Sequence, residues 1–252
     1  MLAQQTLEKL SDLRLRGLAQ AYQDQLQGHD VSGLSFDDRF GLLVDREWVL
    51  RQERRTRARL DKAKLKHQAC REDTDYRHAR GLKKAVMLDL YGCQWVRAKR
   101  NLILTGPTGI GKTWLACALA NAACREGFTA HYARVPRLVH ELMLARADGS
   151  YLKQLARLAK TDLLILDDWG LSPLEGEGLH MLLEVVDDRA GIRSTAVTSQ
   201  LPVEKWHDMM GDPTVADALL DRLLGTAQQI RLKGDSLRRE RPSSDEPAPG
   251  DN

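Results

Sequence analysis

The sequence predicts an α/β fold that is built around a phosphate loop and preceded by a helical N-terminal region. A stretch of apolar or β-branched residues at 102–105, typical of a buried strand, leads directly into the pattern G-x-x-x-x-G-K-T at Gly106–Thr113. Apolar residues then recur at helical spacing up to Ala122, and a second fully apolar stretch, Leu163–Leu166, ends at two aspartates. A strand before the loop and a helix after it favour a phosphate loop over a purely structural glycine turn.

The residue types of the loop match the chemistry of triphosphate binding. Glycines at positions 106, 109 and 111 permit backbone conformations closed to other residues, so consecutive N–H groups can point at a phosphate. The helix that starts near residue 111 adds the positive end of its dipole. We expect Lys112 to bind the β- and γ-phosphates of ATP and the Thr113 hydroxyl to bind Mg²⁺. The predicted nucleotide-binding residues are Gly106, Pro107, Thr108, Gly109, Ile110, Gly111, Lys112, Thr113 and Trp114.

Composition and charge limit the class of protein. The chain has 252 residues, of which 42% are hydrophobic and 29% charged, enough for one ATPase-sized domain with a sizeable core and a smaller region. Residues 1–100 contain 21 Lys and Arg against 14 Asp and Glu, whereas residues 101–252 contain 17 against 21. We therefore expect the basic N-terminal part to be the surface that meets a partner.

Targeting and redox signals favour a cytoplasmic location. Residues 2–18 mix charges into a helical pattern, unlike a signal peptide, and no apolar run approaches the length of a membrane span. We accordingly expect no membrane partner. The four cysteines show no C-x-x-C pairing, and core packing is favoured for Cys117 and Cys124 over a metal or disulfide role.

Two helices are predicted at the start of the chain. Residues 6–27 place apolar side chains on one helical face. A second helix begins with Ser35 as N-cap and Asp38 in the capping-box position. Beyond Trp48 this helix becomes strongly basic, over residues 51–66.

The basic stretch predicts a contact with nucleic acid. Its cations fall close to one helical face, where they can follow a phosphate backbone: Arg51, Arg54, Arg55, Arg59, Lys62 and Lys66. The alternative is a solvated helix face with Glu53 and Asp61 as local partners. Zinc-finger spacing and RNA-binding aromatic motifs are absent from the sequence, so recognition of specific bases is not indicated.

A linking region joins the basic stretch to the phosphate loop. Residues 85–90 predict another helix, and Tyr91–Trp95 follows it just upstream of the loop, where an adenine pocket can form. For Trp95 a position in the core is the favoured interpretation.

The strand at 163–166 brings two carboxylates to the place where a phosphate-loop enzyme holds its metal-facing acid. We expect Asp167 to belong to the Mg²⁺ shell, through water, and Asp168 to orient the attacking water. A plain turn with two aspartates is the alternative. Between the loop and this strand the pattern predicts a strand at 128–135, a helix from Pro136 to about residue 147 and a loop or short helix at 151–160.

Two polar positions later in the chain are candidates for the ATPase site. The strand predicted at 195–198 ends in a polar run that includes Ser199, which with its neighbours can sense the γ-phosphate. The helix predicted at 214–224 carries Arg222, for which a surface ion pair with Asp221 is the alternative role. The other predicted elements are a helix at 174–189 and a strand at 229–232.

The predicted organisation has three parts. They are a helical DNA-binding and assembly domain, an ATPase domain and a mostly disordered, Pro-containing tail, at 1–68, 69–235 and 236–252.

Seven motifs together resemble one family over about residues 6–239. GPTGIGKT, LLILDDWG, TSQLP, DRLLG and KGDSLR occur in this order, behind LRLRGLAQAY and EDTDYRHARGL. This series resembles the IstB-like transposition helper ATPases, relatives of the DnaC-type helicase loaders within the AAA+ class. The phosphate loop by itself resembles that of the AAA+ class in general, whereas the two leading motifs resemble those of the transposition helpers.

The resemblance implies a parallel sheet of five strands, ATP bound at subunit edges, an ATP-dependent homo-oligomer on duplex DNA, and a transposase to which DNA is delivered. It also implies an arginine finger at Arg222, a first sensor at Thr198 or Ser199 and a second sensor at Arg238 or Arg239. The chain departs from the broad class in having Asp168 where Glu is usual. After the last strand the sequence is too short for the usual helical lid.

The expected function is ATP hydrolysis, stimulated by DNA, in a transposition helper. The alternative is a DnaC-like helicase loader, whose leader grips a replicative helicase and whose ATPase senses single-stranded DNA. A metabolic phosphate-loop kinase is a third class, but the sequence shows no small-substrate lid or acceptor motif for it.

Overall fold

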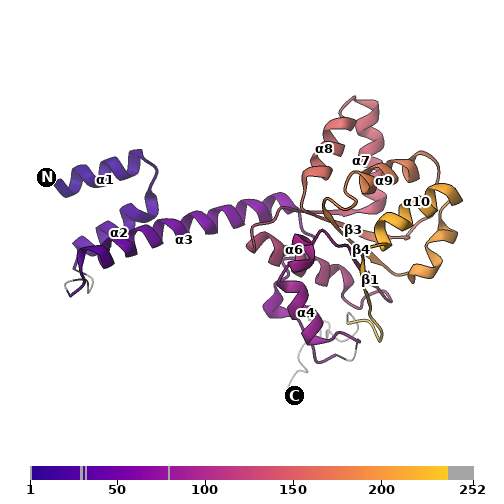
Figure 1. Cartoon of the computed structure of the whole chain (residues 1–252), viewed down its shortest axis with the longest axis horizontal. Helices are drawn as coiled ribbons and strands as arrows, with labels where there is room; N and C mark the ends of the chain where they lie inside the picture. The colour runs from indigo at the N-terminus through magenta and orange to yellow at the C-terminus, as the bar shows by residue number, and fades with distance from the viewer. Residues whose placement is uncertain (1, 29–30, 32, 79, 238–252) are drawn as a thin grey trace, which may run out of the picture. The chain divides into compact units, whose positions relative to one another are not determined.

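The computed structural model describes residues 2–28, 31, 33–78 and 80–237. Two compact units are present, and the boundary between them falls between Ala58 and Arg59, inside the long helix α3, Phe36–Ala63 (Figure 1).

The first unit contains α1, Leu2–Asp12, α2, Arg16–Leu26, and most of α3. The single helix predicted for residues 6–27 is wrong, because Arg14 adopts a left-handed φ of +58° and ends α1 before α2 begins. Gly17 lies where α2 meets α3, and a Cβ there would stand 2.8 Å from the Cα of Glu47. Glu47 in turn accepts a hydrogen bond from the Gly17 N–H, so α2 is capped from a neighbouring helix.

The predicted start of α3 is confirmed. Ser35 Oγ accepts a hydrogen bond from the Asp38 N–H at 3.2 Å and donates one to the Asp38 carboxylate at 2.6 Å. Ser35 thus caps α3 as predicted, while the Asp38 carboxylate bonds the Ser35 hydroxyl instead of the backbone N–H that a capping box would use.

The second unit is built on the predicted parallel sheet of five strands, in the order β2-β3-β4-β1-β5. The strands are β1, Leu102–Thr105; β2, Ala130–Arg134; β3, Leu163–Trp169; β4, Ser194–Ser199; and β5, Gln228–Arg231. The helices are α4, Lys84–Tyr91; α5, Gln94–Arg97; α6, Lys112–Arg125; α7, Val135–Ala147; α8, Tyr151–Lys160; α9, Gly176–Asp187; and α10, Pro213–Leu224. Single 3₁₀ turns lie at Arg71–Asp73, Val203–Lys205 and His207–Met209.

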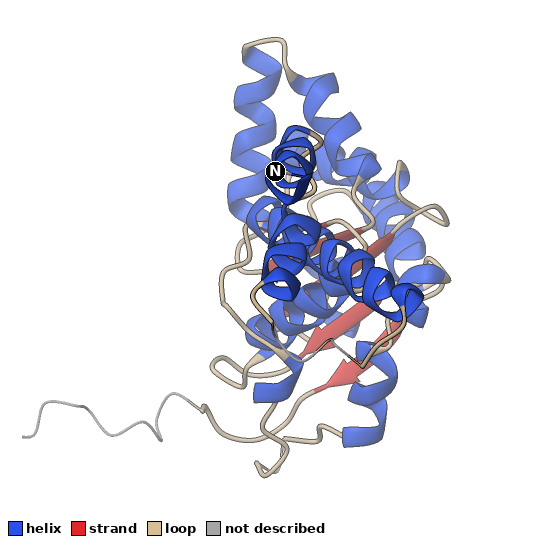
Figure 2. Cartoon of the chain, turned by 90° about the vertical axis from the view of Figure 1, so that its left-hand side faces the viewer, coloured by secondary structure: helices blue, strands red, loops and turns tan. Residues whose placement is uncertain are grey.

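Helices cover both faces of the sheet (Figure 2). The side chains of β1 alternate between two cores. Leu102 and Leu104 of β1 pack with α4 and α6, whereas Ile103 packs with α7, α9 and α10. Because both faces are covered, β1 and the first half of β3 are apolar without alternation, which explains the two continuous apolar runs in the sequence.

The predicted core positions of Trp95 and the cysteines are confirmed. Trp95 is 2% exposed and its indole N–H donates to the Leu90 carbonyl, so it is not an adenine-stacking side chain. Cys117 and Cys124 are buried free thiols, and burial raises the pKa of Cys124 to about 11. Among the described helices, none is both long and apolar enough to cross a membrane.

His131 on β2 makes stability depend on pH. It is 7% exposed, and burial together with the positive charges of Arg157 and Lys64 lowers its pKa to about 4. The unfolded chain therefore binds more protons than the folded one between pH 6.5 and 4, and the free energy of unfolding falls as pH falls through this window. Between pH 7 and pH 5 we expect a loss of about 2 kcal/mol, measured by urea unfolding.

The control for this prediction is a second histidine. His131→Gln should remove this part of the pH dependence, whereas the same change at the exposed His180 should leave it in place. An unchanged pH dependence in His131→Gln would contradict the prediction.

Candidate nucleotide-binding site

The phosphate loop connects β1 to α6 and is shaped by its glycines. Gly106, Gly109 and Gly111 have φ values of +147°, +81° and +94°, which side-chain-bearing residues rarely adopt. Space is also lacking, since a Cβ on Gly106 would stand 2.5 Å from the Leu232 carbonyl oxygen. Lys112 begins α6, and its ammonium donates to the carbonyl oxygens of Gly106 at 2.7 Å and Pro107 at 2.9 Å. The Lys112 ammonium thus contacts the phosphate loop, where it is predicted to bind the β- and γ-phosphates.

The predicted metal-side residues meet at the carboxyl edge of the sheet. Asp167, near the end of β3, is fully buried and accepts a hydrogen bond from the Thr113 hydroxyl at 2.8 Å. The Thr198 hydroxyl at the end of β4 donates to the same carboxylate oxygen. The Tyr132 hydroxyl of β2 donates to the other oxygen at 2.6 Å. Because the strands are parallel, their ends converge at one edge, and residues far apart in sequence form one polar cluster.

Asp168 is held apart from this cluster. Its φ of +59° coincides with an irregularity in the pairing of β3 with β4, and its carboxylate accepts from the Arg134 guanidinium at 2.7 Å. Its backbone N–H contacts the Thr198 hydroxyl at 3.4 Å. The two successive aspartates therefore contact different partners. Asp168 lines the cavity, which favours a role in the site over the alternative of a plain turn.

A cavity of about 790 Å³ lies over the loop and this edge, within the size range of small-molecule sites. Its walls include Lys112, Thr113, Asp168 and Thr198. The donor set fits a magnesium nucleotide: the glycine loop offers backbone N–H groups, the lysine a cation, and the threonine hydroxyl with the Asp167 carboxylate supplies the oxygen ligands that Mg²⁺ prefers.

The IstB-like ATP binding protein family matches residues 8–245 of the chain. This chain belongs to that family. A relative in Sinorhizobium fredii, named as the insertion sequence ATP-binding protein y4pL, is 50% identical over 239 residues, which cover 95% of this chain and 98% of the relative. The predicted family is thereby confirmed.

Solved structures confirm the predicted fold class. The crystal structure of DnaI matches the IstB-like chain with a TM-score of 0.58 and 21% identity, over 70% of this chain and 93% of that one. The structure of the DnaC helicase loader matches with a TM-score of 0.50 and 18% identity, over 63% and 95%. At these identities the likeness shows the fold.

Ser199 lines the cavity together with Thr198, and its role in sensing the γ-phosphate stays a prediction. Its hydroxyl donates to the Trp169 carbonyl at 2.7 Å and accepts from the Leu201 N–H at 3.1 Å, so it supports the backbone of the strand end. The hydroxyl that faces Asp167 in this IstB-like chain belongs to Thr198. Strand alternation explains the difference, because successive side chains point to opposite faces of a sheet.

Arg222 lies on α10, outside the residues that line the cavity of its own chain. Its guanidinium donates to Asp187 at the end of α9 and, at 2.9 Å, to the Ala218 carbonyl. The ion-pair partner is thus Asp187 rather than the adjacent Asp221. The second-sensor candidates Arg238 and Arg239 fall outside the described residues.

The basic stretch is only partly a helix face. Arg54, Arg55 and Lys62 are exposed on α3, and Arg51 pairs with Glu47 at 2.6 Å. Arg59 donates to the carbonyl of Cys124 at 3.3 Å. The inclusion of Lys66 in this face is wrong, because α3 ends at Ala63 and Lys66 lines the nucleotide cavity.

Arg80 is a site residue that the sequence analysis missed. It is 3% exposed, donates to the Ile110 carbonyl in the phosphate loop at 3.1 Å and to the Asp75 carbonyl at 2.7 Å, and lines the cavity. Its Nε has no protein partner. A Cβ on Gly111 would stand 2.7 Å from its guanidinium. The only signal was its position in the family motif EDTDYRHARGL, which carries no chemical meaning until the fold brings it to the loop.

The end of the described chain also contacts the loop. Leu232 N–H donates to the Thr105 carbonyl at 2.8 Å, and Leu237 N–H donates to the Gly109 carbonyl at 3.1 Å. Between β5 and residue 237, where the description stops, no helix forms. Within that part of the chain, a segment without regular secondary structure follows the last strand.

Proposed function

We propose that the chain is an ATP-hydrolysing helper of transposition, which assembles on duplex DNA and delivers it to a transposase. The observation that carries the proposal is the meeting of Lys112 and Thr113 at one cavity of suitable size, with the buried Asp167 carboxylate directly behind Thr113, 2.8 Å from its hydroxyl. The name of the Sinorhizobium relative, an insertion sequence ATP-binding protein, supports the link to transposition.

ATP hydrolysis follows from the roles of the cavity residues. Lys112 and the loop N–H groups bind the phosphates, while Thr113 and Asp167 hold Mg²⁺, directly and through water. When bound, Mg²⁺ neutralises charge on the β- and γ-phosphate oxygens. Asp168, held by Arg134, orients the attacking water, and Thr198 senses the terminal phosphate. This division of roles uses both aspartates of the strand end.

DNA binding is assigned to the cations of α3: Arg51, Arg54, Arg55, Arg59 and Lys62. Such a row binds phosphates without reading bases, so the contact is mainly independent of sequence and depends strongly on salt.

Self-assembly is assigned to Arg222. Its side chain is 33% exposed and is held by Asp187, away from the cavity of its own chain, which suits a contact with the nucleotide of a second copy. In this arrangement ATP joins two copies, and hydrolysis loosens their interface.

The test is ATP hydrolysis without DNA, with duplex DNA and with single-stranded DNA, each at two salt concentrations, with Lys112→Ala as the blank. Stimulation by duplexes of any sequence, lost at high salt, is the expected result. Arg222→Ala should lose this stimulation together with assembly on DNA. An Arg222→Ala protein that assembles and hydrolyses ATP normally would contradict the assembly mechanism.

A helicase loader is the second candidate, favoured by the structural likeness to DnaI and to the DnaC helicase loader. Stimulation by single strands alone would support it. A lack of response to either kind of DNA would mean that the cations of α3 are a solvated face.

A further inference from the structure

Lys66 leaves the basic row of α3 through a sharp turn. The helix ends at Ala63, and Lys64 adopts a left-handed φ of +52°. Ala63 and Ala69, on either side, are fully buried in the core that packs against α6. The turn and these two anchors fix the segment around Lys66 within the second unit, to which it belongs.

The Lys66 side chain reaches the metal-side acid. Its Nζ lies 3.8 Å from Oδ2 of Asp167, and its side chain is 38% exposed. It lines the same cavity as Lys112 and Thr113. Lys66 therefore adds a positive charge to the site, and it comes from a segment outside the phosphate-loop pattern.

The geometry leaves the ammonium able to bind more than Asp167. Both oxygens of that carboxylate already accept hydroxyl hydrogen bonds, from Thr113 and Thr198 on one side and from Tyr132 on the other. At 3.8 Å the ion pair is longer than a hydrogen bond. An ammonium has three donors, and Lys66 lines a cavity suited to a triphosphate, whose charged oxygens accept strong, charge-assisted hydrogen bonds.

We propose that Lys66 is a nucleotide-binding residue, whose ammonium binds the terminal phosphate of ATP beside Asp167, and that it takes no part in binding DNA. The inference rests on the proposed function, because it requires that ATP occupies the cavity.

The experiment measures the affinity of the full chain for a fluorescent, non-hydrolysable ATP analogue and for the matching ADP analogue. Lys66→Met should weaken ATP binding roughly tenfold, as expected for the loss of one charge-assisted contact. It should weaken ADP binding much less, because ADP lacks the terminal phosphate. Lys66→Arg, which keeps the charge, should restore most of the affinity for ATP.

The matched control is Lys64→Met, which removes a cation two residues away that does not line the cavity. It should bind both nucleotides like the unchanged chain. Duplex affinity of Lys66→Met, measured at saturating nucleotide over a salt series, should keep its magnitude and its salt slope. A lower slope would assign Lys66 to DNA and overturn the inference.

Failure of the inference and failure of the proposed function give different results. The inference is wrong, and the proposed function stands, if Lys112→Ala loses nucleotide binding and Lys66→Met shows either of two results. One is normal affinity for ATP. The other is an equal loss of affinity for ATP and for ADP. If Lys112→Ala binds ATP like the unchanged chain, the proposed function itself is wrong.

Discussion

Asp167→Asn is expected to reduce ATP hydrolysis by about a hundredfold or more, the loss associated with a group that holds a catalytic metal ion. The side chain is fully buried, and three hydroxyls donate to it, from Thr113, Thr198 and Tyr132. Asparagine keeps the volume but removes the negative charge and turns one acceptor into a donor. The measurement is phosphate release at saturating ATP, Mg²⁺ and duplex DNA.

The control is the same substitution at the other end of the same strand. Asp162 precedes β3, and its carboxylate accepts from the N–H and the hydroxyl of Thr129, at the edge away from the phosphate loop. Asp162→Asn should therefore keep near-normal hydrolysis. The role given to Asp167 would be wrong if Asp167→Asn, with a normal circular dichroism spectrum, hydrolysed ATP at a rate close to that of Asp162→Asn.

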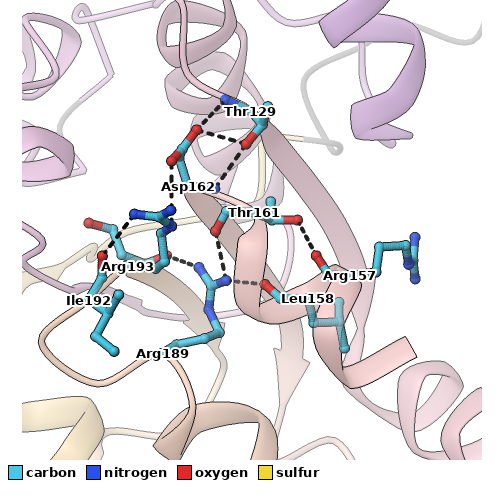
Figure 3. Close-up of polar contacts among 9 residues, drawn as sticks. Thr129, Arg157, Leu158, Thr161, Asp162, Arg189, Ile192 and Arg193 are labelled. Carbon is cyan, nitrogen blue, oxygen red and sulfur yellow. Dashed lines mark hydrogen bonds and ion pairs between the residues drawn. The ribbon is translucent and has the colours of Figure 1, made fainter. Parts of the chain in front are cut away.

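The second large effect concerns a buried arginine at that opposite edge (Figure 3). Arg189 is 1% exposed, and burial, reinforced by the nearby charge of Arg193, lowers its pKa to about 9, so it stays charged at pH 7. Its guanidinium donates to three backbone carbonyls, those of Leu158, Thr161 and Ser194. It thereby joins the end of α8 to the start of β4, and the helix end favours a positive charge.

We expect Arg189→Met to lower the free energy of unfolding by about 3–5 kcal/mol. Methionine fills much of the space, but it leaves the three carbonyls without their donor, and those of Leu158 and Ser194 are in buried contacts, where the loss of a partner is costly. Urea unfolding at pH 7 measures the change. Nucleotide affinity should be unaffected below the unfolding transition, because the phosphate loop lies at the other edge of the sheet.

Arg193→Met is the matched control. Arg193 lies 3.6 Å from Asp162 in an ion pair whose two side chains are each about one-third exposed, and such pairs contribute up to about 1 kcal/mol. If Arg189→Met cost no more than Arg193→Met, the buried guanidinium would have no special role in stability.

Elements with a strong local pattern were predictable from the sequence. The loop at Gly106–Thr113 and the apolar strand before Asp167 fold as expected, because glycine conformations and apolar runs depend on residues close in the chain. The break at Arg14 was not predictable in the same way. The helical periodicity continues across it, whereas the break and the close approach of Gly17 to Glu47 that follows it are features of the tertiary structure.

The candidate site residues likewise fall into those that a local sequence pattern predicts and those that depend on tertiary packing. Lys112, Thr113 and Asp167 come together because each follows a pattern that ends at the carboxyl edge of a parallel sheet. The choice between Thr198 and Ser199 depended on which face each side chain takes, and periodicity alone did not decide it. Side-chain direction at a strand end follows from the pairing with neighbouring strands.

The sequence by itself determined the family, the α/β class and the phosphate loop, because these reside in motifs of contiguous residues. Only the tertiary structure decided that Lys66 leaves the basic helix for the nucleotide cavity, that Arg80 holds the phosphate loop and that Tyr132 donates to Asp167. These contacts join residues that lie far apart in the chain, and spacing along the sequence does not encode such distances. They arise when the burial of two cores brings separate segments to one edge of the sheet.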